Sequence, residues 1–174
     1  MLKLPPLIYF KDYNGNWDKY LEVLYSFFKD DFINNQPVFN GNILKLKKYP
    51  LLNGKEATFW HIISEGEYEE DKIPDLRRCE HLRWPRPVVD SYPHEDIKYW
   101  ENKRGSKNRI CLCYGDWEYL VILDRRAGYI LFWTAYPLNY GHSIKKAKKE
   151  FKEFQKKQTP PLRGGIVTPS THGR

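Results

Sequence analysis

The sequence predicts a single α+β domain in which helical structure comes first along the chain and an antiparallel sheet follows. Apolar residues recur at helical spacing from Trp17 to about Ile33, and Asn16 stands where a helix N-cap is expected. Short apolar runs rich in β-branched and aromatic residues, typical of strands, gather between residues 108 and 136. With 174 residues, 41% of them hydrophobic, the chain is long enough to bury one core. A basic helix is predicted to end the domain, which we place at residues 1–157.

The segment YLVILDRRAGYILFWTAY, residues 119–136, predicts a β-hairpin. Its turn carries Arg125 and Arg126, which we expect to be solvated. Its second strand ends with Thr134 and Tyr136 two residues apart, so their side chains share one face of the strand. A hydroxyl beside a phenol can hold a phosphate or donate a proton. The alternative is simple strand packing with both groups bonded to the backbone.

The remaining segments are assigned from periodicity and from breaks at Pro, Gly and Asn. We expect, in chain order, an extended pair at residues 38–49 with a bend at Gly41, a short buried strand at 57–63, a short helix at 74–84 with Pro74 at its first position, a second short helix at 97–103, a strand at 108–114 and a C-terminal helix from Ser143 to about Lys157. Residues 158–174 are a basic tail rich in Pro and Gly, which predicts disorder.

The net charge of +7 is confined to the end of the chain. After His142 there are nine Lys and Arg residues against two Glu, while the residues before it are electrically balanced. This distribution favours an anionic partner near the C-terminal helix, with nucleic acid as the first candidate. The residues expected to make sequence-independent contacts with RNA phosphates are His142, Lys145, Lys146, Lys148 and Lys149. The alternative is a solvated helix followed by a flexible basic tail.

Cysteine usage and hydropathy indicate the compartment. The three cysteines include no C-x-x-C pair, and Cys111 and Cys113 would share one face of a strand, a poor geometry for a disulfide. An odd number of free, buried thiols fits a reducing cytoplasm. No apolar run approaches the roughly 20 residues that a membrane-spanning helix requires, and the N-terminus has no signal-peptide pattern. We therefore expect a cytoplasmic protein with no membrane partner.

The sequence contains no recognisable cofactor or metal motif. Neither the histidines nor the cysteines have a trusted ligand spacing, and there is no glycine-rich phosphate loop, nucleophile elbow or carboxylate pair. The polar residues that remain are Arg, His, Thr, Tyr and Lys, and such a set can cleave RNA through the RNA's own 2′-hydroxyl. That reaction needs a base for the 2′-oxygen, an acid for the leaving 5′-oxygen and cations on the phosphate. We expect no cofactor and no metal.

His61 is the best candidate for the acid–base group. It stands between Trp60 and Ile62 in an apolar segment, where a titrating imidazole needs a reason to be placed. The alternative is a core histidine with a hydrogen-bonded ring.

The helix predicted over DLRRCEHLRW supplies candidate phosphate ligands. At about 100° per residue, its apolar residues form one buried stripe: Leu76, Cys79 and Leu82. Arg83 falls within this stripe and Arg78 lies beside it. Because an arginine among apolar residues needs an anionic partner, both are expected to point toward the sheet and a phosphate. The alternative is an internal salt bridge with Glu80 or Glu65.

The segments FWHIISEG, PDLRRCEHLRWPRPVV and YLVILDRRAGYILFWTAY, followed by His142 and the basic helix KKAKKEF, resemble phage- and plasmid-associated members of the barnase–EndoU–colicin E5/D–RelE (BECR) superfamily. The similarity covers roughly residues 57–151. It implies a compact fold of N-terminal helices packed on a four-stranded antiparallel sheet. It also implies metal-independent RNA cleavage, often by a toxin that an antitoxin restrains. Carried onto this sequence, the matching polar positions are His61, Arg78, Arg83, Thr134 and Tyr136.

The leading hypothesis is a toxin-like endoribonuclease that leaves a 2′,3′-cyclic phosphate. His61 would act as general base or acid, Arg83 and Arg78 would hold the scissile phosphate, and Tyr136 and Thr134 would support or protonate it. The expected partners are RNA and an antitoxin or immunity protein. The rival hypothesis is a nucleic-acid-binding or partner-binding accessory protein with no chemistry. A third is an inhibitor that uses its basic face on an acidic protein.

Overall fold

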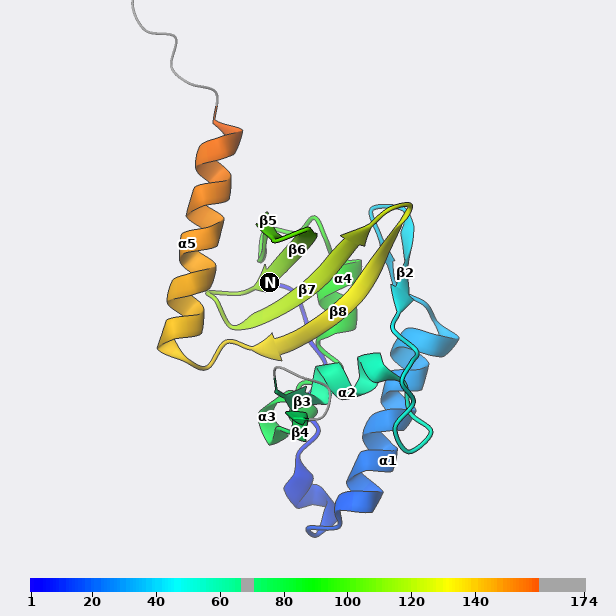
Figure 1. Cartoon of the computed structure of the whole chain (residues 1–174). Helices are drawn as coiled ribbons and strands as arrows, with labels where there is room; N and C mark the ends of the chain where they lie inside the picture. The colour runs from blue at the N-terminus through cyan, green and yellow to red at the C-terminus, as the bar shows by residue number, and fades with distance from the viewer. Residues whose placement is uncertain (67–70, 160–174) are drawn as a thin grey trace, which may run out of the picture.

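A computed structural model describes residues 1–66 and 71–159 (Figure 1). A curled, six-stranded mixed sheet in the order β1-β2-β8-β7-β6-β5 forms its centre. Neighbouring strands run antiparallel except β2 and β8, which are parallel. The expected sheet of about four antiparallel strands is therefore wrong: strands β5 to β8 do form an antiparallel run of four, but β2 and β1 extend it and make it mixed.

The sheet strands are β1 (Val38–Phe39), β2 (Asn42–Leu46), β5 (Ile97–Arg104), β6 (Lys107–Tyr114), β7 (Tyr119–Arg126) and β8 (Tyr129–Pro137). A separate two-stranded ribbon pairs β3 (Ser64–Glu65) with β4 (Ile73–Pro74). The α-helices of the described residues are α1 (Trp17–Phe28), α2 (Ala57–Ile63), α3 (Leu76–Glu80), α4 (Pro85–Asp90) and α5 (Gly141–Gln158). A 3-10 turn, η1 (Phe10–Tyr13), precedes α1, and a π-helical turn, η2 (Lys29–Asn34), extends it.

Several expected elements are confirmed. The first helix begins at the expected cap, where the Asn16 side-chain oxygen accepts a hydrogen bond from the Lys19 backbone N–H at 3.0 Å. The bend between β1 and β2 occurs at Asn40-Gly41, where both residues have positive φ (47° and 76°), a conformation that Gly and Asn adopt at low cost. The hairpin of β7 and β8 and the basic helix α5 also form as expected. Of the tail expected to be disordered, residues 158–174, Gln158 ends α5, and residues 160–174 lie outside the described residues.

Three short segments differ from expectation. Residues 57–63 form helix α2 rather than a strand. The sequence does not distinguish the two, because all seven residues are buried and a short apolar run shows no helical or strand periodicity. Residues 97–104 form strand β5 rather than a helix, since they pair with β6 along their whole length. The helix expected at 74–84 ends at Glu80, and Pro85 begins a new helix at the point where we expected only a break.

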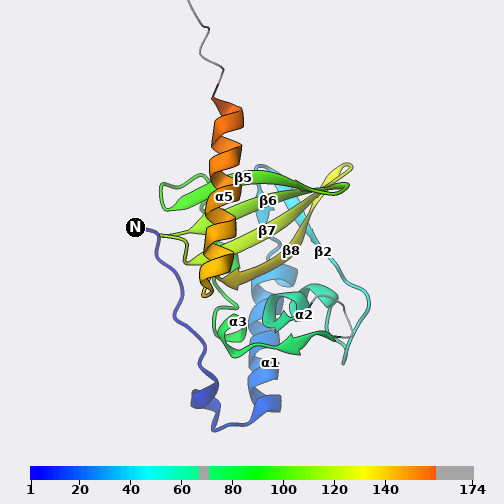
Figure 2. The same ribbon diagram turned by 60° about the vertical axis from the view of Figure 1, so that its left-hand side comes forward.

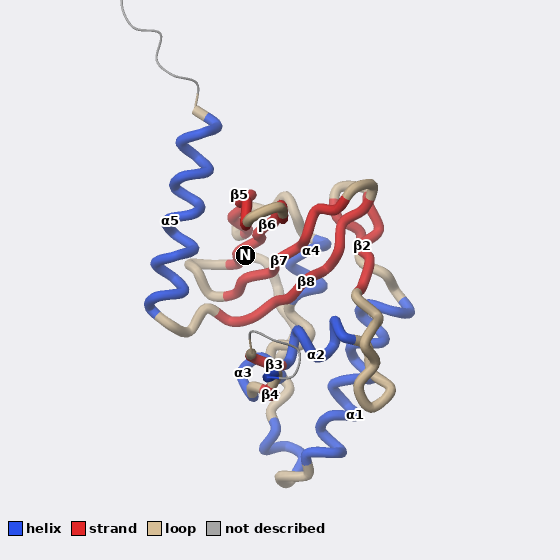
Figure 3. The backbone as a smooth tube through the Cα atoms, viewed as in Figure 1, coloured by secondary structure: helices blue, strands red, loops and turns tan. Residues whose placement is uncertain are grey.

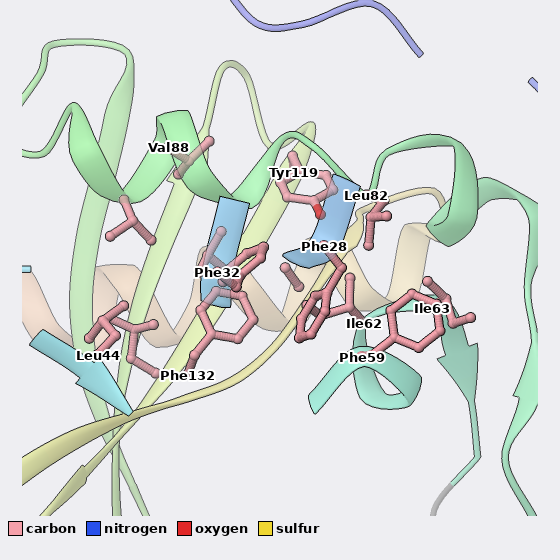
Figure 4. Close-up of a cluster of buried hydrophobic side chains, with 14 of the residues drawn as sticks. Phe28, Phe32, Leu44, Phe59, Ile62, Ile63, Leu82, Val88, Tyr119 and Phe132 are labelled. Carbon is pink, nitrogen blue, oxygen red and sulfur yellow. The ribbon is translucent and has the colours of Figure 1, made fainter. Parts of the chain in front are cut away.

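The two faces of the sheet are covered differently. Helices α1 to α4 cover one face, called here the core face, and α5 crosses the other, called here the α5 face (Figures 2 and 3). The core face holds a large cluster of buried aromatic and aliphatic side chains, including Phe28, Phe32, Phe59 and Phe132 (Figure 4). The α5 face holds a smaller cluster in which Trp100 and Trp117 pack against Phe151 of α5.

A β-bulge in β8 decides which side chains reach each face. Ile122 pairs with Thr134 while the next residue, Leu123, pairs with Phe132, so Trp133 is an extra residue with no partner on β7. The extra residue shifts the alternation of side chains along β8. Phe132 and the later Ala135 belong to the core cluster, whereas Thr134 and Tyr136 pair with residues of the α5 face. The expectation that Thr134 and Tyr136 share one strand face is confirmed.

Candidate functional site

Two adjoining pockets lie where the end of β8 meets α2, α3 and the start of α5. The inner pocket, of about 160 Å³, is lined by His61, Ser64, Gly66, Lys72, Arg78, Trp133, Thr134 and Tyr136. The outer pocket, of about 380 Å³, is lined by Glu65, Asp75, Arg77, Arg78, Tyr136, Pro137, Asn139, Tyr140, His142 and Ser143. The two pockets share Arg78 and Tyr136 and therefore lie side by side.

Four of the five residues expected to be catalytic line the inner pocket. The Thr134 hydroxyl donates a hydrogen bond of 2.8 Å to the backbone carbonyl of His61, and Nη1 of Arg78 donates a longer one of 3.5 Å to the same oxygen. The Arg78 guanidinium carbon lies 4.7 Å from the ring centroid of Tyr136. Residues of α2 and α3 are therefore in contact with residues of β8 that lie more than fifty positions later in the chain.

His61 occupies the last turn of α2. A carbonyl in that position has no partner within its own helix, and Thr134 and Arg78 provide one. The His61 side chain is 4% exposed, lines the inner pocket and lies 5.2 Å from the Trp133 indole, centroid to centroid. Tertiary contacts thus position both the backbone and the imidazole of His61.

Arg78 is a mostly buried cation with weak compensation. Its backbone N–H donates to the N-cap carboxylate of Asp75 at 2.9 Å, which anchors the first turn of α3. Its side chain is 16% exposed, and Nε lies 3.8 Å from a Glu65 carboxylate oxygen without forming a hydrogen bond to any described residue. A buried donor without an acceptor costs about 1–3 kcal/mol. An anion in the pocket would therefore stabilise Arg78.

Tyr136 can supply a proton. Burial raises the pKa of its phenol above the ordinary value, and the nearby Arg78 guanidinium offsets part of that rise. The phenol is therefore protonated at neutral pH, which suits a hydrogen-bond donor or general acid and excludes the role of a base.

Arg83 lies elsewhere, which corrects the expectation that it faces the sheet and a phosphate. Its Nε and Nη2 donate to the Asp31 carboxylate at 3.2 and 3.3 Å, and its guanidinium carbon lies 4.5 Å from the Phe27 ring centroid. It lines a different pocket, with Asp31 and Arg86. The reason is that α3 ends at Glu80, so helical stepping does not extend to residue 83. The alternative of an internal salt bridge holds, although the partner is Asp31 rather than Glu80 or Glu65.

The residues expected to contact RNA divide into two groups. His142 lines the outer pocket and stacks on Tyr140 with a centroid distance of 5.6 Å. The four lysines project from α5 and line neither pocket: Lys145, Lys146, Lys148 and Lys149. They form an exposed basic band on the first half of the helix.

The sequence reasoning missed Trp133 and Arg77. Trp133 reaches the inner pocket because of the bulge, and nothing in the sequence marks a bulge at that position. Arg77 lines the outer pocket beside Arg78; the Arg77-Arg78 pair was visible in the sequence, but the true start of the helix was not. The turn arginines are exposed, as expected, and each also forms an ion pair: Arg125 with Glu101 at 3.0 Å and Arg126 with Asp124 at 2.6 Å.

The cysteines are unsuited to nucleophilic chemistry. All three are free and buried, as expected, and burial raises the pKa of each thiol to about 12: Cys79, Cys111 and Cys113. Within residues 1–66 and 71–159 no group of three or more His, Cys, Asp or Glu side chains is placed to hold a metal ion. The same part of the chain contains no helix with the length and apolar character needed to cross a membrane.

Comparison of the chain with protein-family models, with curated proteins and with solved structures found no match in any of the three.

Proposed function

We propose that this protein binds RNA across the inner and outer pockets and cleaves it by metal-independent transesterification. One observation carries the proposal: an imidazole, a weakly compensated guanidinium and a protonated phenol line one small pocket. These groups correspond to the base, the phosphate ligand and the acid that the reaction needs. The basic band on α5 adds a route for the flanking backbone, since phosphate contacts dominate affinity for nucleic acids.

The proposed roles follow the geometry. His61 takes the proton of the 2′-hydroxyl while its oxygen attacks the adjacent phosphorus. The bond from phosphorus to the 5′-oxygen breaks, and Tyr136 donates a proton to that leaving oxygen. Arg78 neutralises the phosphate oxygens, and the products are a 2′,3′-cyclic phosphate and a free 5′-hydroxyl. Thr134 acts as a positioning residue through the carbonyl of His61, and Arg83 has no part in the reaction.

The proposal extends to a toxin-like role in which an antitoxin or immunity protein restrains the enzyme. This part rests on the resemblance of the segments around His61, Arg78 and Tyr136 to the BECR superfamily.

The test is cleavage of RNA in the presence of EDTA, with detection of cyclic-phosphate ends. The variants H61A, R78A and Y136F should each lower the rate by about 10²- to 10⁴-fold, the usual contribution of an acid–base or charge-stabilising group. R83A is the matched control, because it removes an arginine from the neighbouring turn but not from the pocket, and it should cut at the rate of the unchanged protein. Equal rates for H61A, R78A and the unchanged protein would refute the site.

A non-catalytic RNA-binding protein is the second candidate. The burial of His61 and the use of the Thr134 hydroxyl by a backbone carbonyl favour it, because both suit a structural role. In that case the protein would bind RNA without producing cyclic-phosphate ends, and H61A would bind as tightly as the unchanged protein.

A further inference from the structure

The α5 face continues beyond the inner pocket toward the tips of the two hairpins. Helix α5 covers only its other part, where the Glu150 carboxylate accepts hydrogen bonds from Asn102 at 2.7 Å and from the Trp100 indole at 3.2 Å. The uncovered part begins next to Trp133. Three side chains there, Lys107, Arg109 and Trp133, are called here the Trp133 strip.

The strand register places the members of the Trp133 strip together. Lys107 and Arg109 are two residues apart on β6, so their side chains share one face. Arg109 pairs with Asp124, which lies two residues after Ile122 and therefore on the α5 face of β7. The bulge adds Trp133 from β8. The Arg109 guanidinium carbon is 4.3 Å and the Lys107 Nζ is 5.3 Å from the Trp133 ring centroid.

Arg109 packs against the indole. Its side chain is 8% exposed, its Nε lies 3.9 Å from the fully buried Asp124 carboxylate, and its Nη1 has no hydrogen-bond partner among the described residues. The burial of Arg109 and its 4.3 Å contact with the ring make it a packed support for the indole. Trp133 itself remains partly exposed and lines the inner pocket.

Lys107 is the exposed charge of the strip. It is exposed, and no carboxylate among residues 1–66 and 71–159 lies within salt-bridge distance of its ammonium group. Proteins bind single-stranded nucleic acid with an aromatic ring beside a cation that has no carboxylate partner: the base stacks on the ring and the cation holds the backbone.

We propose that the Trp133 strip binds an unpaired nucleobase of the RNA, stacked on the Trp133 indole, with Lys107 on the adjoining phosphate. The substrate class is therefore single-stranded RNA, which rests on the proposed function because the stacked base lies next to the cleavage pocket. Duplex RNA fits less well, since its bases are already stacked and paired and it presents mainly phosphates and 2′-hydroxyls to a protein.

The test measures binding of a fluorescein-labelled 2′-O-methyl oligoribonucleotide by anisotropy, as a single strand and as a duplex. This probe lacks the 2′-hydroxyl, so the unchanged full-length chain cannot cleave it by the proposed route. Trp133→Leu should weaken single-strand binding by about 5- to 100-fold, the usual effect of losing one stacked base, and leave duplex binding unchanged. Trp133→Phe, which keeps an aromatic ring, should retain most of the affinity.

Two exposed lysines of the same hairpin give a matched pair. Lys107→Ala should weaken single-strand binding and lower the slope of log Kd against log salt by about one. Lys103→Ala should change neither, because Lys103 pairs with Asn108 and so faces away from the strip. Circular dichroism shows whether Trp133→Leu folds. If it does not, the two lysine variants still test whether the Trp133 strip binds single-stranded RNA, because both positions are exposed.

The strip is excluded if Trp133→Leu folds and binds the single strand as tightly as the unchanged protein, or if Lys107→Ala behaves like Lys103→Ala. If the unchanged protein cleaves RNA but these variants bind normally, only the strip is wrong. If it binds neither probe and cleaves no RNA, the proposed function fails as well.

Discussion

Adjacent residues of β8 serve opposite faces of the sheet. Phe132 is fully buried on the core face and meets Phe32 at a centroid distance of 5.1 Å. Trp133 lies next to it, on the α5 face, among cations and a histidine. Strand alternation separates Phe132 from Trp133, and the bulge at Trp133 then places Thr134 and Tyr136 on the α5 face as well, so one strand contributes both to the hydrophobic core and to a polar pocket. A short register irregularity is enough to re-aim these side chains, as bulges beside functional sites commonly do.

The two faces also differ in the kinds of side chain that they bury. On the core face the largest buried side chains pack as aromatic pairs, such as Phe28 with Phe32 and Phe28 with Phe59. The α5 face buries Asp124 completely beside two arginines, Arg109 and Arg126. Buried ion pairs contribute little net stability, because desolvation offsets their attraction. We therefore expect stability to depend mainly on the core face, and the proposed RNA binding to use mainly the α5 face.

The largest expected effect is on the core face. Phe132→Ala should lower the free energy of unfolding by about 3–5 kcal/mol, the usual cost of emptying a buried phenylalanine site. Trp133→Leu, one residue further, should cost only about 1–2 kcal/mol because its indole is partly exposed. Urea unfolding followed by circular dichroism measures both. Equal losses at the two positions would remove the distinction between the faces.

A smaller effect is expected at the link between the α5 face and α2. Thr134→Val keeps the shape and the strand preference of the residue but removes the hydrogen bond to the His61 carbonyl, so it should cost about 1–2 kcal/mol. Thr159→Val, at an exposed position after α5, is the control and should change the urea midpoint little. If the two variants are equally stable, the Thr134 hydroxyl does not hold α2 against the sheet.

Arg83 should contribute to the free energy of unfolding but not to the proposed RNA cleavage. Arg83→Ala removes a two-pronged ion pair with Asp31, which is worth about 1 kcal/mol at a partly exposed site. Asp31→Asn and the double variant complete a thermodynamic cycle, in which a coupling energy near zero would contradict the pairing. RNA cleavage by Arg83→Ala should equal that of the unchanged protein, unlike cleavage by Arg78→Ala.

The smallest expected effect concerns pH. Burial lowers the pKa of the His81 imidazole below its ordinary value, although its hydrogen bond with the Arg77 carbonyl opposes the shift. The unfolded chain therefore takes up a proton before the folded one does, so stability is lost as pH falls below about 6.5. His81→Gln should show a shallower decline of the urea midpoint between pH 7.5 and 5. His142→Gln, at an exposed position, should decline like the unchanged protein.

Local patterns in the chain were sufficient for part of the fold and of the site. The cap at Asn16, the hairpin of β7 and β8 and the basic helix were predictable, because each depends on interactions between residues close in sequence. His61 and Tyr136 were predictable as candidates, because a histidine in an apolar segment and a phenol at a strand end are visible without a structure. Arg83 was misjudged because its orientation depended on a helix end that propensity did not reveal.

By itself, the sequence determined the order of helix, hairpin and basic helix, the confinement of the net charge to the C-terminal end and the set of polar residues available for chemistry. Only the tertiary structure decided that β2 joins β8 in parallel, that residues 57–63 form a helix and that a bulge at Trp133 turns Thr134 and Tyr136 onto the α5 face. These outcomes depend on contacts between segments distant along the chain. Their energies come from burial and strand pairing in the folded state, which no local pattern encodes.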